Sequence, residues 1–186
     1  MNYNNIVFWG DSLTFGARTY GCFPMYLVDL LNSATPYNWR AINRGVNGYT
    51  ARDLWFKVNW ELEKLTDTYL SCVLIGTNDC SELSDSSIFK SYLQQLLDAI
   101  YIKKGKRIYL GEIPGIVQNA HPFFPKETIE KRIELNNVIN EICSNDKRIE
   151  LVRFDLSIEC FEDSVHFSEK GNMSVAKSFF TKIINS

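Results

Sequence analysis

Residues 6–13 read Ile6-Val7-Phe8-Trp9-Gly10-Asp11-Ser12-Leu13, and this stretch decides the fold. Its four apolar residues form a short uninterrupted run, which is typical of a strand buried on both faces of a parallel sheet. Gly10 and Asp11 end the strand in a turn, and Ser12 follows them directly. Ligands of open α/β sheets bind at the carboxyl ends of the strands. Ser12 therefore stands where a nucleophile would be presented, although a serine in such a turn often only caps a helix.

Short apolar runs alternate with longer amphipathic segments along the rest of the chain, without repeats or a linker. This order predicts parallel β-α-β units. We expect strands at 6–9, 39–43, 70–75, 107–111 and 149–154, and helices at 23–32, 51–64, 87–103, 126–143 and 168–184. The 186 residues amount to one domain's length of chain, so we expect an α/β fold in a single domain over residues 1–186.

A serine hydroxyl is a weak nucleophile at neutral pH, so Ser12 needs a base and a group that orients the base. The segment Asp163-Ser164-Val165-His166 supplies both, and His166 is one of only two histidines in the chain. At this spacing the carboxylate can accept a hydrogen bond from Nδ1 of the imidazole while Nε2 faces the serine. The alternative is that Asp163 and His166 only cap the helix that follows. We interpret Ser12, His166 and Asp163 as the nucleophile, the base and the orienting acid.

Acyl transfer also needs hydrogen-bond donors for the oxyanion of a tetrahedral intermediate. Two glycines, Gly45 and Gly48, follow a predicted strand, and the N–H of a glycine there is open to a ligand, although both glycines also fit an ordinary tight turn. In Gly76-Thr77-Asn78-Asp79 another predicted strand ends in a polar turn, where the Asn78 amide is a further candidate donor. We expect Asp11 and Asp79, which flank these positions, to brace their loops rather than to transfer protons.

Together these four segments resemble the SGNH hydrolases, the GDSL-type esterases and lipases, in order, spacing and local context. The resemblance runs from Ile6 to about Lys182. It implies a flavodoxin-like three-layer α/β/α sandwich with a mostly parallel five-stranded sheet, and hydrolysis of esters or thioesters at the carboxyl ends of the strands. The family's motif residues match Ser12, Gly48, Asn78 and His166, with Asp163 in Asp-x-x-His, and Gly45 stays open as the oxyanion glycine. The oxyanion hole that the resemblance implies consists of Ser12, Gly48 and Asn78.

The composition disfavours several other classes of protein. A net charge of −2 disfavours a nucleic-acid groove, and no apolar run reaches the roughly 18 residues that a membrane span requires. The chain lacks a phosphate-binding Gly-rich loop with lysine and a metal-ligand spacing, so we expect no cofactor and no metal. Five scattered cysteines favour free thiols, and the N-terminal residues lack a signal-peptide pattern, so we expect a cytoplasmic protein. Cys80 is a weaker candidate nucleophile, because cysteines are usually buried small hydrophobes.

Two segments are candidates for determining substrate specificity: the loop at 113–125, which contains His121, and Arg18-Thr19-Tyr20. The alternative for both is a solvated loop that does not contact the substrate. The expected partner is a small or soluble acyl ester, such as an acetylated sugar, a short acyl ester or an acyl thioester. Acyl chain length and oligomeric state are left open. The same triad would serve an acyltransferase, and an inactive domain of this fold would bind acylated glycans or a protein. The filled catalytic positions disfavour the inactive domain, and the acyltransferase stays open beside the hydrolase.

Overall fold

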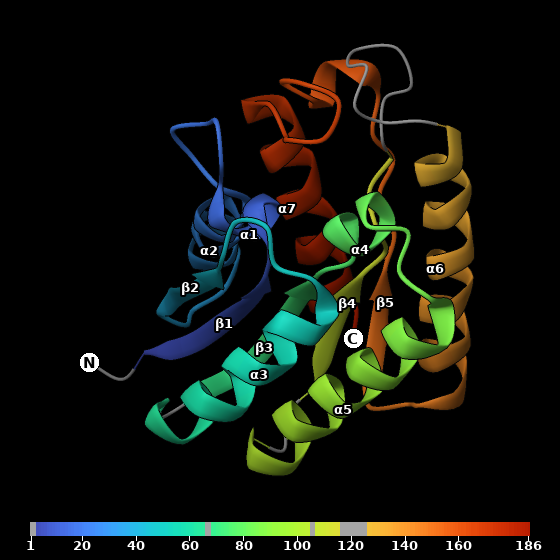
Figure 1. The fold of residues 1–186 in the computed structure, drawn as a ribbon. Coiled ribbons are helices and arrows are strands. Elements are labelled where there is room, and N and C mark those ends of the chain that lie inside the picture. The colour runs from blue at the N-terminus through green and yellow to red at the C-terminus, as the bar shows by residue number, and fades with distance from the viewer. Residues whose placement is uncertain (1–2, 66–67, 105–106, 116–125) are drawn as a thin grey trace.

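The computed structural model describes residues 3–65, 68–104, 107–115 and 126–186 (Figure 1). Their central sheet has the strand order β2-β1-β3-β4-β5, and every pair of neighbours is parallel. This order is that of flavodoxin-like folds. The strands are β1 (Asn4–Gly10), β2 (Trp39–Gly45), β3 (Thr68–Leu74), β4 (Ile108–Gly111) and β5 (Ile149–Val152). The five predicted strands are thus confirmed, with small shifts at their ends.

Helices cover both faces of the sheet, which confirms the expected α/β/α sandwich (Figure 1). One face carries α2 (Phe23–Ala34) and α7 (Glu169–Ile184). The other carries α3 (Ala51–Glu61), extended by the 3-10 turn Leu62–Lys64, together with α5 (Ser86–Lys104) and α6 (Lys126–Asn145). Three short elements were not predicted from sequence, namely the helices α1 (Ser12–Phe15) and α4 (Thr77–Ser81) and a 3-10 turn at Ile158–Cys160.

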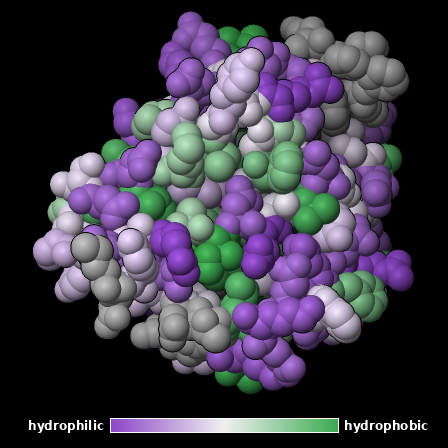
Figure 2. Space-filling view, turned by 90° about the vertical axis from the view of Figure 1, so that its left-hand side faces the viewer, coloured by the Kyte–Doolittle hydropathy of each residue, from purple (hydrophilic) through white to green (hydrophobic). Residues whose placement is uncertain are grey.

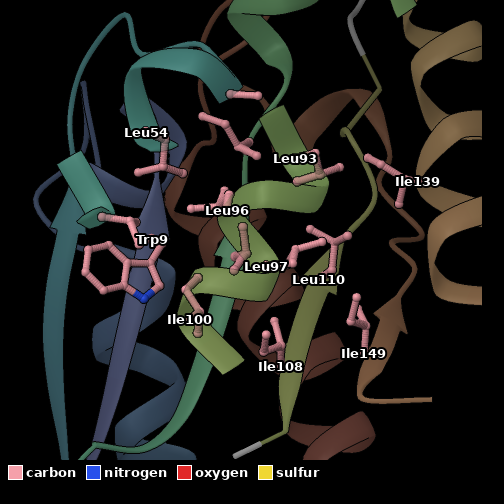
Figure 3. Close-up of a cluster of buried hydrophobic side chains, with 14 of the residues drawn as sticks. Trp9, Leu54, Leu93, Leu96, Leu97, Ile100, Ile108, Leu110, Ile139 and Ile149 are labelled. Carbon is pink, nitrogen blue, oxygen red and sulfur yellow. The ribbon is translucent and has the colours of Figure 1, made fainter. Parts of the chain in front are cut away.

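The first strand shows why this sequence forms a central strand. Side chains alternate between the two faces of a strand, and in β1 both faces are apolar. Ile6 and Phe8 pack in the cluster under α2 and α7, whereas Val7 and Trp9 pack in the cluster under α3 and α5. Figure 3 shows the second cluster, where Trp9 lies near Leu54 of α3 and Leu96 of α5, and aliphatic side chains of β4, α6 and β5 continue the cluster. The uninterrupted apolar run is therefore the pattern of a strand that is covered by helices on both faces.

The carboxyl ends of the three strands that carry candidate residues lie level with one another. Gly10, at the end of β1, pairs with Gly45 of β2 and with Leu74 of β3. A Cβ atom at position 10 would lie 2.1 Å from the Thr14 hydroxyl oxygen and 2.2 Å from the Leu74 carbonyl oxygen, so only glycine fits there. The sheet thereby brings the segments after β1, β2 and β3 to one edge.

The surface on the β2 side of the molecule is mostly hydrophilic, with hydrophobic side chains in small separate groups (Figure 2). Within the described parts of the chain, no helix combines the length and the apolar character needed to cross a membrane.

Candidate active site

Ser12 opens α1 directly after β1, and the chain holds it there with a local cap. The Asp11 carboxylate accepts a hydrogen bond from the backbone N–H of Leu13 at 2.9 Å and so caps the helix. Gly16 ends the helix in a left-handed conformation, with φ of 91°. The Ser12 side chain is 8% exposed, and its backbone N–H has no acceptor among the described residues. Ser12 thus pairs a slightly accessible hydroxyl with an unused N–H donor.

Asp163 and His166 form the pair that the sequence predicts. Nδ1 of His166 lies 2.9 Å from Oδ2 of Asp163, and Oδ1 of Asp163 accepts the backbone N–H groups of Val165 and His166, each at 2.8 Å. Burial disfavours the charged carboxylate, but these hydrogen bonds outweigh it and hold the pKa of Asp163 below its usual value. An ionised Asp163 favours a proton on Nδ1, which leaves Nε2 as the basic nitrogen.

The loop that carries this pair is folded back on itself and capped. Phe161 and Phe167 form an isolated antiparallel bridge, and the N–H of Glu162 donates to the carbonyl of His166 at 2.8 Å. The Ser168 hydroxyl, rather than Asp163 or His166, caps α7 by accepting from the N–H of Gly171 at 3.3 Å. The helix-capping alternative for Asp163 and His166 is therefore not what these side chains do.

Three contacts, made by the side chains of Asn172 and Arg18, join the His166 side of the site to the segment that follows Ser12. The side chain of Asn172 in α7 accepts the N–H of Phe23 at 2.9 Å and donates to the Thr19 hydroxyl at 3.3 Å. Nε of Arg18 lies 3.2 Å from Oδ2 of Asp163. These contacts were not predicted from sequence, because they join residues far apart in the chain and have no local signal.

The two glycines after β2 differ in whether their N–H groups are free. The N–H of Gly45 donates to the Asn43 side chain at 2.9 Å, and a Cβ there would lie 2.3 Å from the backbone nitrogen of Phe15. Gly48 has φ of 79° and open space where a Cβ would stand, and its N–H has no acceptor among the described residues. Gly45 therefore serves close backbone packing, and Gly48 is the better candidate for an oxyanion donor.

Asn78 and Asp79 tie the turn after β3 to the segment that holds Gly48. The Asn78 amide donates to the Tyr49 carbonyl at 2.9 Å, which leaves its second N–H without an acceptor among the described residues. The Asp79 carboxylate accepts the N–H of Ala51, the first residue of α3, at 2.9 Å. Thr50 and Asp53 form a capping box at the same helix end. The turn that carries Asn78 is thus tied to the segment that carries Gly48.

Asp11 and Asp79 are buried carboxyl groups with raised pKa values. Burial is the main cause at Asp11, where the negative charge of Asp79 adds to it and the N–H of Leu13 opposes it, and the pKa reaches about 7. Burial likewise raises the pKa of Asp79 to about 6, against the N–H of Ala51. Oδ2 of Asp11 is fully buried and has no hydrogen-bond partner among the described residues. Their hydrogen bonds to helix N-termini agree with the bracing role expected from sequence.

The remaining sequence candidates are placed as follows. Cys80 is fully buried, and burial raises the pKa of its thiol to about 12, so it is not a thiolate nucleophile at neutral pH. His121 and residues 116–125 of the candidate loop lie outside the described residues. Over the described ranges, no group of three or more His, Cys, Asp or Glu side chains is arranged to hold a metal ion.

Comparison with known proteins identifies one family and one fold. A sequence model of the GDSL-like lipase/acylhydrolase family matches residues 8–173. A search of curated protein sequences found no match. An aryl esterase of M. smegmatis has a similar structure, with a TM-score of 0.83 and 16% sequence identity over 98% of this chain and 99% of that chain. A lipase/acylhydrolase from Enterococcus faecalis has a TM-score of 0.80 and 21% identity over 98% of this chain and 96% of that chain. A carbohydrate acetylesterase from Sinorhizobium meliloti has a TM-score of 0.81 and 15% identity over 98% of this chain and 99% of that chain.

Proposed function

Since the chain belongs to the GDSL-like lipase/acylhydrolase family and is thus a hydrolase of carboxylic esters, we propose that Ser12, His166 and Asp163 are the triad that cleaves the ester. The observation that carries this proposal is the Asp163–His166 contact of 2.9 Å on a loop that is tied to the segment after Ser12. The ionised Asp163 fixes the imidazole tautomer that has a basic Nε2.

In the first half of the reaction, the Ser12 hydroxyl oxygen attacks the ester carbonyl carbon while Nε2 of His166 takes the hydroxyl proton. The tetrahedral intermediate then collapses, and His166 returns the proton to the leaving alcohol oxygen. This leaves an acyl group on Ser12. Water attacks that acyl-enzyme with the same help from His166 and releases the carboxylic acid. His166 acts as a base in both halves of the reaction, and it does so as a neutral imidazole.

The oxyanion of each intermediate accepts hydrogen bonds from the backbone N–H groups of Ser12 and Gly48 and from the Asn78 amide. Support comes from the unused N–H groups of Ser12 and Gly48, and from the second N–H of Asn78. The N–H of Gly45 is already bonded to Asn43, which makes Gly45 the weaker choice. Donors that are fixed before the reaction stabilise the transition state without reorganising during it.

We propose a small or soluble ester with a short acyl group as the substrate, such as an acetylated sugar. A carbohydrate acetylesterase and an acetyl xylan esterase among the structural neighbours are consistent with this choice. We also propose one domain over the 186 residues and, on the ground that all five cysteines are free, a cytoplasmic location. Transfer of the acyl group to a bound alcohol would use the same triad, and it differs only in what attacks the acyl-enzyme.

Nitrophenol release from 4-nitrophenyl acetate, butyrate and octanoate, measured with a chelator present, tests the proposal. We expect wild-type protein to hydrolyse the short esters and the Ser12→Ala variant to fall to the background rate. Ser81→Ala, which changes an exposed serine on α4, is the matched control and should behave as wild type. Equal rates for wild type and Ser12→Ala would contradict the proposed nucleophile.

A further inference from the structure

Arg18 places a positive charge beside Asp163, the residue that orients the proposed base. Its Nε lies 3.2 Å from Oδ2 of Asp163, the same oxygen that lies 2.9 Å from Nδ1 of His166. Asp163 therefore faces two nitrogen groups at once, an imidazole and a guanidinium. One edge of the guanidinium is thus fixed relative to the triad.

The segment that carries Arg18 is held in one conformation. Arg18 has φ of 67°, in the left-handed region that side-chain-bearing residues seldom adopt, and such conformations persist only where surrounding contacts impose them. The contacts come from the next residue, since the Thr19 hydroxyl donates to the carbonyls of Gly16 and Gly21, at 3.3 and 2.7 Å, and accepts from Asn172 at 3.3 Å. Arg18 is thus preorganised rather than placed on a free loop.

Most of the Arg18 side chain is left for a ligand. It is 65% exposed, and neither Nη atom has a hydrogen-bond or ion-pair partner within the described parts of the chain. The guanidinium is a rigid planar group, so with Nε at Asp163 the two Nη atoms remain as an outward pair of donors. Paired guanidinium donors bind carboxylate, sulfate and phosphate groups well.

The proposed mechanism indicates which part of the ester passes Arg18. His166 must touch the oxygen of the leaving alcohol to return the proton, so the alcohol portion lies on the His166 side of the site. We infer that Arg18 binds an anionic substituent on the alcohol portion of the substrate and so selects esters of acidic alcohols. This inference rests on the proposed function.

The test compares hydrolysis of 4-acetoxybenzoate with that of its neutral methyl ester, methyl 4-acetoxybenzoate, at the acetyl group. We expect Arg18→Gln to lower kcat/KM for the anionic ester, relative to the neutral one, by about fivefold or more, since one charge pair contributes on the order of 1 kcal/mol. Taking the ratio of the two esters in each protein cancels their difference in intrinsic reactivity and any general effect on Asp163. Raising the salt concentration should reduce the wild-type ratio and leave the Arg18→Gln ratio unchanged.

Two further variants separate a charge effect from a structural one. Arg18→Lys should keep part of the ratio, because it keeps the charge but not the planar donor pair. Arg107→Gln, which removes an exposed cation just before β4 at the opposite edge of the sheet, should leave the ratio as in wild type. Acetate esters of phenols that carry a phosphate or a sulfate group in place of the carboxylate then identify the preferred anion.

The outcomes are distinct. The inference is overturned if the ratio of kcat/KM for the anionic ester to that for the neutral ester is the same in Arg18→Gln as in wild type, or if Arg107→Gln lowers it equally. In that case, Ser12-dependent hydrolysis would still support the proposed function. Absence of Ser12-dependent hydrolysis of both esters and of the nitrophenyl esters would overturn the proposed function, and this inference with it.

Discussion

The two halves of the candidate site are held in place in different ways. Ser12, Gly48 and Asn78 follow closely on the ends of β1, β2 and β3, where strand register and close backbone contacts fix their positions. Asp163 and His166 lie on a long loop well past the end of β5, and hydrogen bonds of individual side chains hold that loop. The strand-end half is therefore positioned by the central strands, whereas the loop half can be altered one contact at a time.

The loop half should show the largest effect on catalysis when Asp163 is changed to Asn. The Asn side chain keeps an oxygen for the N–H groups of Val165 and His166, so the loop stays folded, but it no longer favours the proton on Nδ1. We expect kcat for 4-nitrophenyl acetate to fall by about 10⁴-fold. Glu162→Gln, an exposed neighbour, is the control. A loss smaller than tenfold would mean that Asp163 does not orient the base.

The buried carboxyl group of Asp11 in the strand-end half should make the free energy of unfolding depend on pH. Because the folded-state pKa of Asp11 is about 7, against about 4 in the unfolded chain, the folded protein binds more protons between these values. The free energy of unfolding should therefore fall as the pH rises from about 4 to 7, by up to about 4 kcal/mol from Asp11.

The matched variant is Asp11→Asn, which keeps an acceptor for Leu13 and removes the titrating group. Urea unfolding at several pH values should give a flatter curve for Asp11→Asn than for wild type, while Asp29→Asn, at an exposed position on α2, should follow wild type. Parallel curves for Asp11→Asn and wild type would show that ionisation of Asp11 does not lower the free energy of unfolding, which would contradict this prediction.

Asn78→Ala removes one proposed oxyanion donor from the strand-end half. We expect kcat to fall by about 10²–10³-fold with KM little changed, because the donor acts on charge that develops in the transition state. Asn47→Ala changes an exposed asparagine in the neighbouring loop and should leave kcat unchanged. Full activity in Asn78→Ala would remove Asn78 from the oxyanion hole.

The smallest expected effect concerns Asn172, whose side chain links α7, next to the loop half, to the segment after Ser12. Asn172→Ala breaks the links to Phe23 and Thr19 and should lower the free energy of unfolding by about 1–3 kcal/mol, since it leaves the buried N–H of Phe23 without an acceptor. Asn172→Asp keeps the acceptor for Phe23 and should recover part of the loss. If both variants were as stable as wild type, these links would not hold the loop.

The strand-end half was also the more predictable half from sequence. Each strand there is an apolar run that ends in glycine or a polar turn, so both the strand and the residues after it carry a local signal. The five strands and five long helices were predicted with errors of only a few residues, and the sheet topology then brings Ser12, Gly48 and Asn78 to one edge.

What sequence did not indicate depends on distant contacts or on very short elements. The helices α1 and α4 are too short to show a hydrophobic period. The contacts of Asn172 with Phe23 and of Arg18 with Asp163 join residues far apart in the chain, and only the folded backbone brings them together. The choice of Gly48 over Gly45 also needed the structure, because it depends on a hydrogen bond from Gly45 to Asn43.

The most direct test of the central claim is to treat the protein with phenylmethylsulfonyl fluoride, which sulfonylates activated serines, and to locate the label by peptide mass spectrometry. We expect one sulfonyl group, on Ser12, with ester hydrolysis lost in proportion to labelling, and no label at Ser12 in His166→Ala. Hydrolysis that persists with Ser12 fully labelled, or equal labelling of Ser12 in His166→Ala, would contradict a nucleophilic Ser12 activated by His166.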